Sequence, residues 1–152
     1  MTPKPYRFRQ RGVAAIEFMI VAPLLLMMML AIAELSNALL QYNTLSKAVR
    51  DGARYAADHA NLGSTGLAQP GPWMDAAANL TVFGNLAGNG LPRLPELSTE
   101  HVEVTVVDDQ HIRVSAVYGY QALFAAIPTF GFGDGPIRPA FDLQATVIMR
   151  AL

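Results

Sequence analysis

Residues 11–37 read RGVAAIEFMIVAPLLLMMMLAIAELSN, and this stretch decides how the chain is organised. From Val13 to Ala33 the only charged residue is Glu17. A helix of roughly 20 apolar residues is long enough to cross a bilayer core of about 30 Å. The stretch therefore predicts one membrane-spanning helix. Pro23 interrupts it and is expected to kink the helix near residues 19–23, because proline removes one backbone donor.

The charges that flank the apolar stretch predict its orientation. Four basic residues and no acidic residue precede Val13: Lys4, Arg7, Arg9 and Arg11. An excess of Lys and Arg marks the cytoplasmic side, so the N-terminus is expected in the cytoplasm and the rest outside. The net charge is −1, and loss of those four charges would leave −5. The remaining chain has no basic patch, so nucleic acid is not an expected partner.

Three interpretations of this segment compete. It is a simple signal anchor, a secretory signal cleaved after Ala31-Ile32-Ala33, or a prepilin signal. A prepilin signal needs a short basic leader, a glycine just before the apolar segment, and a glutamate as the fifth residue after the cut. Gly12 and Glu17 stand at that spacing.

Glu17 carries most of the weight in this choice. A carboxylate inside a membrane helix costs on the order of 2.5–3.5 kcal/mol at the centre and less near an end. In a polymer, the acid can pair with the α-amino group that cleavage creates at Val13 of the same or a neighbouring subunit. The alternative is that Glu17 only reaches to the lipid headgroups.

The motif resembles the start of TadE-like proteins, minor pilin-like components of the tight-adherence (Tad, Flp-type) pilus. The likeness covers roughly residues 11–57, through RGVAAIEF (11–18), PLLL (23–26), Glu34-Leu35, LLQYN (39–43) and AVRDGARY (48–55). Residues 101–152 resemble the family only in pattern, and residues 60–100 hardly at all. Major pilins of this system usually carry Glu-Tyr where this chain has Glu17-Phe18, and they are far shorter. General-secretion pseudopilins commonly begin with Phe, where this chain has Val13.

The resemblance implies a non-enzymatic role in pilus assembly and adhesion. It implies cleavage after Gly12 by a prepilin peptidase, with a TadF-like minor pilin and the major Flp pilin as partners. The protein is then expected in the bacterial inner membrane as a single-pass protein, with its C-terminal domain periplasmic or extracellular, or incorporated in the pilus. The competing interpretation is an uncleaved, signal-anchored accessory domain that binds an envelope partner.

The helix is expected to continue beyond the membrane. An apolar stripe recurs at three- and four-residue steps as Leu35, Ala38, Leu39, Tyr42, Leu45, Val49, Ala53 and Ala56. A helix from Val13 to about Asp58 would be about 69 Å long. Small residues on it (Ala48, Gly52, Ala53, Ala56 and Ala57) permit close packing of a neighbouring element. The expected divisions are a leader (1–12), a transmembrane helix (13–34), an amphipathic extension (35–59) and an outer α+β domain (60–152).

The outer domain is expected to add a short helix over residues 73–87 and a small antiparallel sheet. Residues 102–106 and 112–120 alternate apolar and polar side chains around a turn at Asp108-Asp109-Gln110, which predicts a hairpin. Residues 141–150 predict a third strand. The fold class is therefore α+β and pilin-like, with about three strands packed on the long helix.

The sequence offers little catalytic or metal-binding chemistry. It has no cysteine, and its three histidines (His59, His101 and His111) lack helical metal-ligand spacing. Position 111 is expected to face about residue 107 across the hairpin. No cofactor, metal or small-molecule substrate is therefore expected. An aromatic-rich stretch (Tyr118, Tyr120, Phe124, Phe130 and Phe132) is either core or, where exposed, a contact surface.

Overall fold

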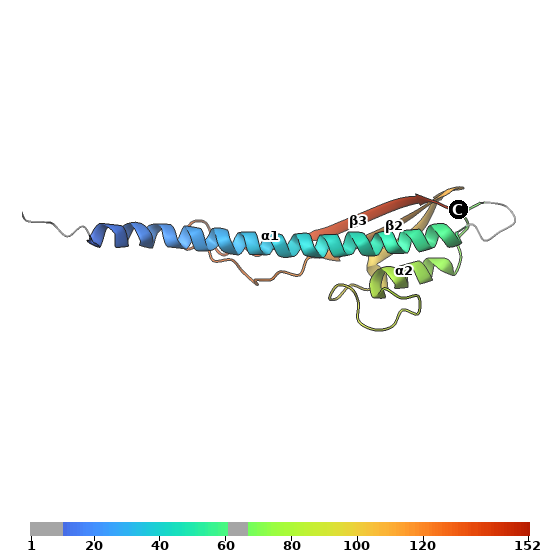
Figure 1. The fold of residues 1–152 in the computed structure, drawn as a ribbon, viewed down its shortest axis with the longest axis horizontal. Helices are drawn as coiled ribbons and strands as arrows, with labels where there is room; N and C mark the ends of the chain where they lie inside the picture. The colour runs from blue at the N-terminus through green and yellow to red at the C-terminus, as the bar shows by residue number, and fades with distance from the viewer. Residues whose placement is uncertain (1–10, 61–66) are drawn as a thin grey trace, which may run out of the picture.

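The computed structural model describes residues 11–60 and 67–152. Its elements are α1 (Arg11–His59), α2 (Trp73–Phe83), the short 3₁₀ helix η1 (Thr99–His101), β1 (Val102–Asp108), β2 (His111–Gly119) and β3 (Asp142–Arg150). Figure 1 shows α1 as a long rod, with the sheet and α2 gathered along its C-terminal half. The expected α+β fold, a long N-terminal helix with a three-stranded antiparallel sheet, is confirmed.

Helix α1 has 49 residues, which corresponds to a length of about 74 Å at 1.5 Å per residue. The sequence predicted a helix from Val13 to about Asp58, and the observed bounds differ by one or two residues. Pro23 lies inside α1, and the helix continues on both sides of it. The proline therefore does not end the helix, and the kink expected there stays a prediction.

The sheet has the order β1-β2-β3, and both strand pairs are antiparallel. Side chains alternate between the two faces of a strand. Val104 lies opposite Val114, and Ala116 lies opposite Ala145, so one apolar face runs across all three strands. The inward side chains of the central strand are all buried: Ile112, Val114, Ala116 and Tyr118. The predicted hairpin is thus confirmed, and β3 begins one residue later than expected.

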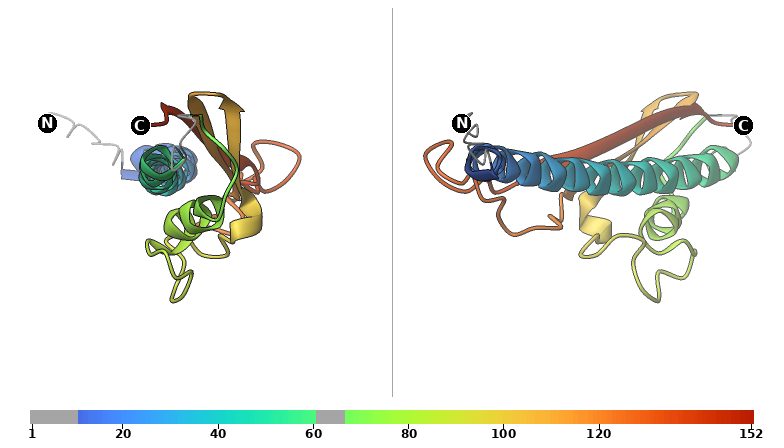
Figure 2. Two further views of the ribbon diagram at one scale, coloured as in Figure 1. Left: turned by 90° about the vertical axis from the view of Figure 1, so that its right-hand side faces the viewer. Right: turned by 60° about the vertical axis from the view of Figure 1, so that its left-hand side comes forward.

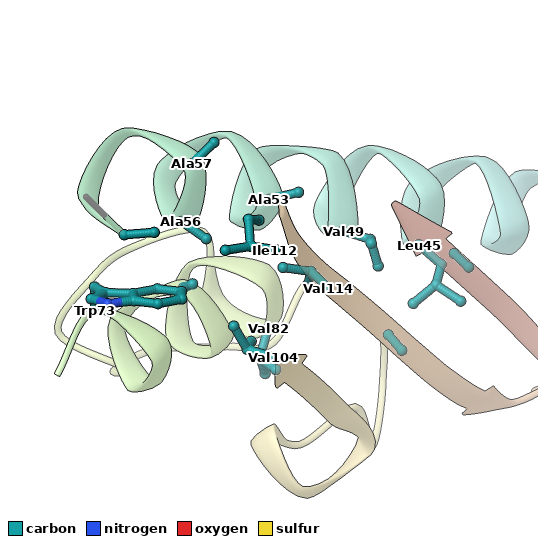
Figure 3. Close-up of a cluster of buried hydrophobic side chains, with 14 of the residues drawn as sticks. Leu45, Val49, Ala53, Ala56, Ala57, Trp73, Val82, Val104, Ile112 and Val114 are labelled. Atoms are coloured by element: carbon teal, nitrogen blue, oxygen red, sulfur yellow. The ribbon is translucent and has the colours of Figure 1, made fainter. Parts of the chain in front are cut away.

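The core lies between this apolar face, α1 and α2. Figure 3 shows Leu45, Val49 and Ala53 of α1 on the side of the helix that faces β2. Trp73 and Val82 of α2 close the core from a second side (Figure 3). Figure 2 shows the same arrangement end-on, with the sheet and α2 on different sides of α1. One face of the outer half of α1 is therefore buried by two elements.

Helix α2 is shorter than the expected range of 73–87. It ends at Phe83 because Gly84 adopts a left-handed conformation with φ of 74°, and its N–H donates to the carbonyl of Leu80 at 2.9 Å. Such a left-handed residue, usually glycine, is a common way to end a helix. Gly84, which lies inside the predicted range, was thus the sequence signal for the end of the helix.

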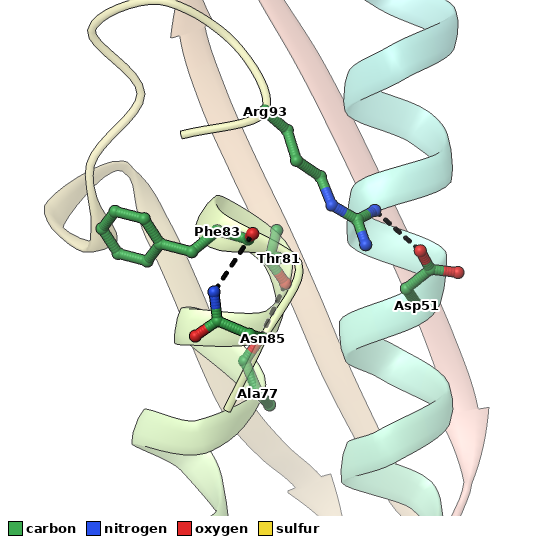
Figure 4. Close-up of polar contacts among 6 residues, drawn as sticks. All are labelled: Asp51, Ala77, Thr81, Phe83, Asn85 and Arg93. Carbon is green, nitrogen blue, oxygen red and sulfur yellow. Dashed lines mark hydrogen bonds and ion pairs between the residues drawn. The ribbon is translucent and has the colours of Figure 1, made fainter. Parts of the chain in front are cut away.

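The close approach of α1 and α2 depends on Gly52. A Cβ at this position would collide with the Thr81 hydroxyl and lie 2.9 Å from the carbonyl oxygen of Ala77. Thr81 is fully buried and donates its hydroxyl to the same carbonyl at 2.8 Å (Figure 4). Nearby, Arg93 forms an ion pair with Asp51 of α1 at 2.7 Å, which ties the loop after α2 to α1 (Figure 4). The small residues of α1 therefore serve packing within the chain.

The predicted apolar stripe of α1 is only partly correct. Five of its residues are buried: Ala38, Leu45, Val49, Ala53 and Ala56. Leu35, Leu39 and Tyr42 are exposed. The buried face differs from the stripe because the segment after β2 packs against the side of α1 that carries Glu34, Asn37 and Gln41. The prediction that Leu35 and Leu39 are buried relied on hydropathy alone. In the structure, the segment that covers this part of α1 is bound by polar residues of the helix.

Candidate functional site

The expected cleavage junction lies in the first turn of α1. Gly12 and Val13 are helical and exposed, directly after Arg11. Among the described residues, a Cβ built on Gly12 would have no close contact within 4 Å, so this part of the fold does not require a glycine here. The other basic residues expected in the leader (Lys4, Arg7 and Arg9) lie outside the described residues.

Glu17 lies about one turn further along the same helix. Its side chain is exposed, and it makes no hydrogen bond or ion pair within residues 11–60 and 67–152. The spacing of four residues places Glu17 on the same face as Val13, about 6 Å further along the axis. The carboxylate thus stands on the face where cleavage before Val13 would create a free amine.

None of residues 13–33, the apolar half of α1, is buried within the chain. Helix α1 is the one helix in the described part of the chain that is long and apolar enough to cross a membrane, by length and composition. Large apolar side chains are exposed all around it, among them Phe18, Ile20, Leu25 and Met29. Such a helix, hydrophobic on every side, is typical of a membrane span. The chain therefore carries features of a single-pass anchor.

A second acidic residue at the other end of this apolar segment was not singled out from the sequence. Glu34 is only 6% exposed. Its carboxylate accepts hydrogen bonds from the Tyr120 hydroxyl at 2.6 Å and from the backbone N–H groups of Leu123 and Phe124 at 3.0 and 3.2 Å. A buried charge needs such partners, because burial without them is costly. Glu34 thus holds the chain that leaves β2 against α1.

Two further polar residues of α1 extend this contact. Asn37 donates to the Tyr120 hydroxyl and to the Gln121 carbonyl, both at 3.0 Å. Gln41 makes two bonds to the backbone of Gln121, one as donor at 2.7 Å and one as acceptor at 3.1 Å. We call Glu34, Asn37, Gln41 and Tyr120 the junction cluster. The three α1 residues recur at helical spacing, and that spacing was the sequence signal available for this face.

The junction cluster also changes the acidity of Tyr120. Burial, together with the hydrogen bond to the Glu34 carboxylate, raises the pKa of the Tyr120 phenol above its usual value. Its ring also stacks on Phe141, with centroids 4.6 Å apart. Tyr120 therefore stays protonated and continues to donate to Glu34 near neutral pH.

The three histidines are far from forming a common site. His59 stacks on Tyr55, His101 contacts Ser98, and His111 contacts the Asp108 carboxylate at 2.8 Å. His111 pairs with Asp108, not with residue 107 as expected, because the register shifts between Val106 and Asp108. Within the described residues, no three His, Cys, Asp or Glu side chains gather as a metal site would require.

The comparisons with known proteins bear on the N-terminal segment. Neither the search of curated proteins nor the search of solved structures found a match. A scan of protein families matched residues 12–54 to the family described as TadE-like protein. The matched range contains the Gly12-Val13 junction, Glu17 and Glu34. The resemblance expected from the sequence is therefore confirmed, and over residues 12–54 this chain matches the TadE-like family.

Proposed function

We propose that this protein is a minor pilin-like component of a Tad-type pilus. In this proposal a prepilin peptidase removes residues 1–12, and the processed protein takes part in pilus assembly and adhesion. The observation that carries the proposal is the position of Gly12, Val13 and Glu17 at the uncovered start of an apolar helix that matches the TadE-like family.

The surroundings of Gly12 support processing at this junction. The described fold leaves open space around it, so its glycine is available for a requirement imposed by another protein. An entering peptidase must reach the backbone, and both Gly12 and Val13 are exposed. The basic residues before the junction favour the cytoplasmic side, where we place the cleavage.

The state of Glu17 supports a role between subunits. An ionised acid in lipid is costly, and Glu17 has no partner within the described part of its own chain. The α-amino group of Val13 would carry a positive charge near neutral pH, because its ordinary pKa is about 7.7–8.0. Pairing of this amine with Glu17 of the same or a neighbouring subunit satisfies both groups in a low-dielectric environment.

The helix beyond the membrane offers a surface to partner subunits. Leu35, Leu39 and Tyr42 are exposed on the matched segment, just outside the proposed transmembrane range of 13–34. Exposed apolar side chains in a group are typical of an interaction surface. We propose the major Flp pilin and a TadF-like minor pilin as partners, with the outer domain (60–152) outside the inner membrane.

The proposal is tested by the intact mass of the full chain expressed with an active or an inactivated prepilin peptidase. We expect loss of residues 1–12 only with the active enzyme. Gly12→Val is the matched variant, because a Cβ at this position has no close contact with the described residues, so the variant should block cleavage without unfolding the protein. An unchanged mass with the active enzyme contradicts processing and favours the alternative, an uncleaved signal-anchored accessory domain.

A further inference from the structure

The β2–β3 connection, residues 120–141, is the longest segment without a helix or strand in the outer domain's described residues. Figure 1 shows that it extends beyond the sheet toward the N-terminal end of α1, level with the apolar half of that helix. The second view in Figure 2 shows the same displacement toward that end. The connection is therefore the part of the outer domain that lies nearest to the membrane anchor along the axis.

The junction cluster sets where this connection starts. Glu34 binds the N–H groups of Leu123 and Phe124, and Glu34 is the first charged residue after the apolar segment that follows Glu17. In the proposed topology, this residue marks the outer membrane surface. A connection that is held to α1 at Glu34 and extends from there toward the anchor therefore crosses the level of the outer headgroups.

The far end of the connection is a folded tip. Ile127 and Ile137 exchange two backbone hydrogen bonds, at 2.8 and 3.0 Å, so residues 128–136 form a closed loop between them. Inside the loop, the Thr129 hydroxyl donates to the Gly135 carbonyl at 3.1 Å, and the Phe132 N–H donates to the Thr129 carbonyl at 2.8 Å. The tip thus has a defined conformation.

That conformation points aromatic rings outward. Phe130 and Phe132 are 46% and 60% exposed, and Phe130 adopts a positive φ of 49°, which is uncommon for a bulky residue. In contrast, Tyr118 and Tyr120 from the same aromatic-rich stretch are buried. The stretch therefore divides into core and surface. Its exposed part continues through other large apolar side chains of the connection: Leu123, Ile137 and Phe141.

We propose that the tip of the β2–β3 connection inserts Phe130 and Phe132 into the outer leaflet of the bilayer that α1 spans, near the boundary between headgroups and acyl chains. The occupant of this surface is lipid, because the tip is level with the apolar half of α1 and continues its apolar surface. Apolar and aromatic side chains bury favourably at the boundary between headgroups and acyl chains. The insertion is shallow, because the non-helical backbone of the tip cannot satisfy its polar groups in the hydrocarbon core. Asp134 and Arg138 carry opposite charges, so anionic lipid is not required.

The test uses the full chain in phosphatidylcholine vesicles, and the absence of cysteine allows single labels. An environment-sensitive fluorophore is placed at Phe132→Cys in the tip, Ile20→Cys in the anchor, or Leu91→Cys in the loop after α2. Leu91 is a matched control because it is an apolar loop residue that is 91% exposed. Quencher-bearing lipids carry the quencher near the headgroup or at the end of the acyl chain.

We expect the probe at 132 to shift its emission to the blue and to lose emission with the headgroup-proximal quencher more than with the deep one. The probe at 91 should respond to neither. A probe at 132 that behaves like the probe at 91 overturns the proposal. So does a blue shift without lipid quenching, because it indicates contact with protein. Quenching at both 91 and 132 also overturns it, since the contact would not be specific to the tip.

The inference rests on the anchor in the proposed function, and the probe at 20 separates the two. If the probe at 20 is not quenched, the membrane anchor itself is wrong. If it is quenched and the probe at 132 is not, only the insertion of the tip is wrong. A second variant, Phe130→Ser combined with Phe132→Ser, removes exposed rings only. We expect it to abolish quenching of a probe at Ile137→Cys, whereas Leu91→Ser should leave that quenching unchanged.

Discussion

The two halves of α1 are both rich in apolar residues, but they meet different surroundings. Around Leu25 no residue of the helix is buried within the chain, whereas around Leu45 one face is covered by the sheet and α2. A helix that is apolar all round needs lipid, and a helix with one apolar face needs a protein core. The contrast teaches that hydrophobicity alone does not say what buries a residue. Its distribution around the helix does.

The largest expected change in the free energy of unfolding comes from replacing a leucine by alanine, and doing so in each half of α1 tests the comparison. Leu45→Ala removes a fully buried side chain, and such substitutions cost about 2–5 kcal/mol in free energy of unfolding. Leu25→Ala removes a side chain that is 55% exposed within the chain, so the outer domain should keep its stability. Thermal unfolding of both variants in the same detergent measures the difference. Equal losses would show that the two halves are not distinct environments.

A smaller effect is expected where the two halves meet, at the junction cluster. Tyr120→Phe removes the hydroxyl that donates to Glu34, and loss of a buried hydrogen bond to a charged group costs about 1–3 kcal/mol. We expect faster hydrogen exchange at the Leu123 and Phe124 amides, because Glu34 then holds the connection less tightly. Tyr42→Phe is the control, since Tyr42 is exposed. Unchanged exchange at both amides in Tyr120→Phe would contradict the role of the cluster.

The smallest effect on stability is expected at Glu17, although its effect on function should be large. Glu17→Ala removes an exposed side chain without a partner in the described chain, so cleavage and unfolding of the outer domain should not change. Assembly should fail, because the Val13 amine loses its proposed partner. Counting pili in cells that carry the variant measures this, with Glu100→Ala as an exposed acidic control. Normal piliation by Glu17→Ala would argue against the pairing.

The parts of the fold that follow local rules were predictable. Apolar and polar residues alternate on both sides of residues 108–110, and this alternation predicted β1, β2 and the turn between them. The long apolar run predicted α1. The packing of Gly52 against α2 was predictable only as a close approach, because the sequence does not say which element comes close. The end of α2 at Gly84 was missed because the apolar pattern continues past it.

The part of the site that depends on distant residues was not predictable. Glu34 and Tyr120 are separated by 86 positions, and no local pattern connects them. The aromatic-rich stretch posed the same difficulty, since its spacing fits both core and surface. The path of the backbone separates the two: Tyr118 and Tyr120 lie at the end of the sheet and are buried, whereas Phe130 and Phe132 lie beyond it and are exposed.

The sequence by itself determined the long helix, its division into two environments, the hairpin, and the motif of Gly12, Val13 and Glu17 that matches the TadE-like family. These depend on contacts along the chain or on the composition of one helix. Only the tertiary structure decided that Glu34 is buried, that Leu35 and Leu39 face outward, and that Phe130 and Phe132 extend toward the anchor. The physical reason is that burial of a side chain depends on which distant segment covers it, and that segment is placed by the whole fold.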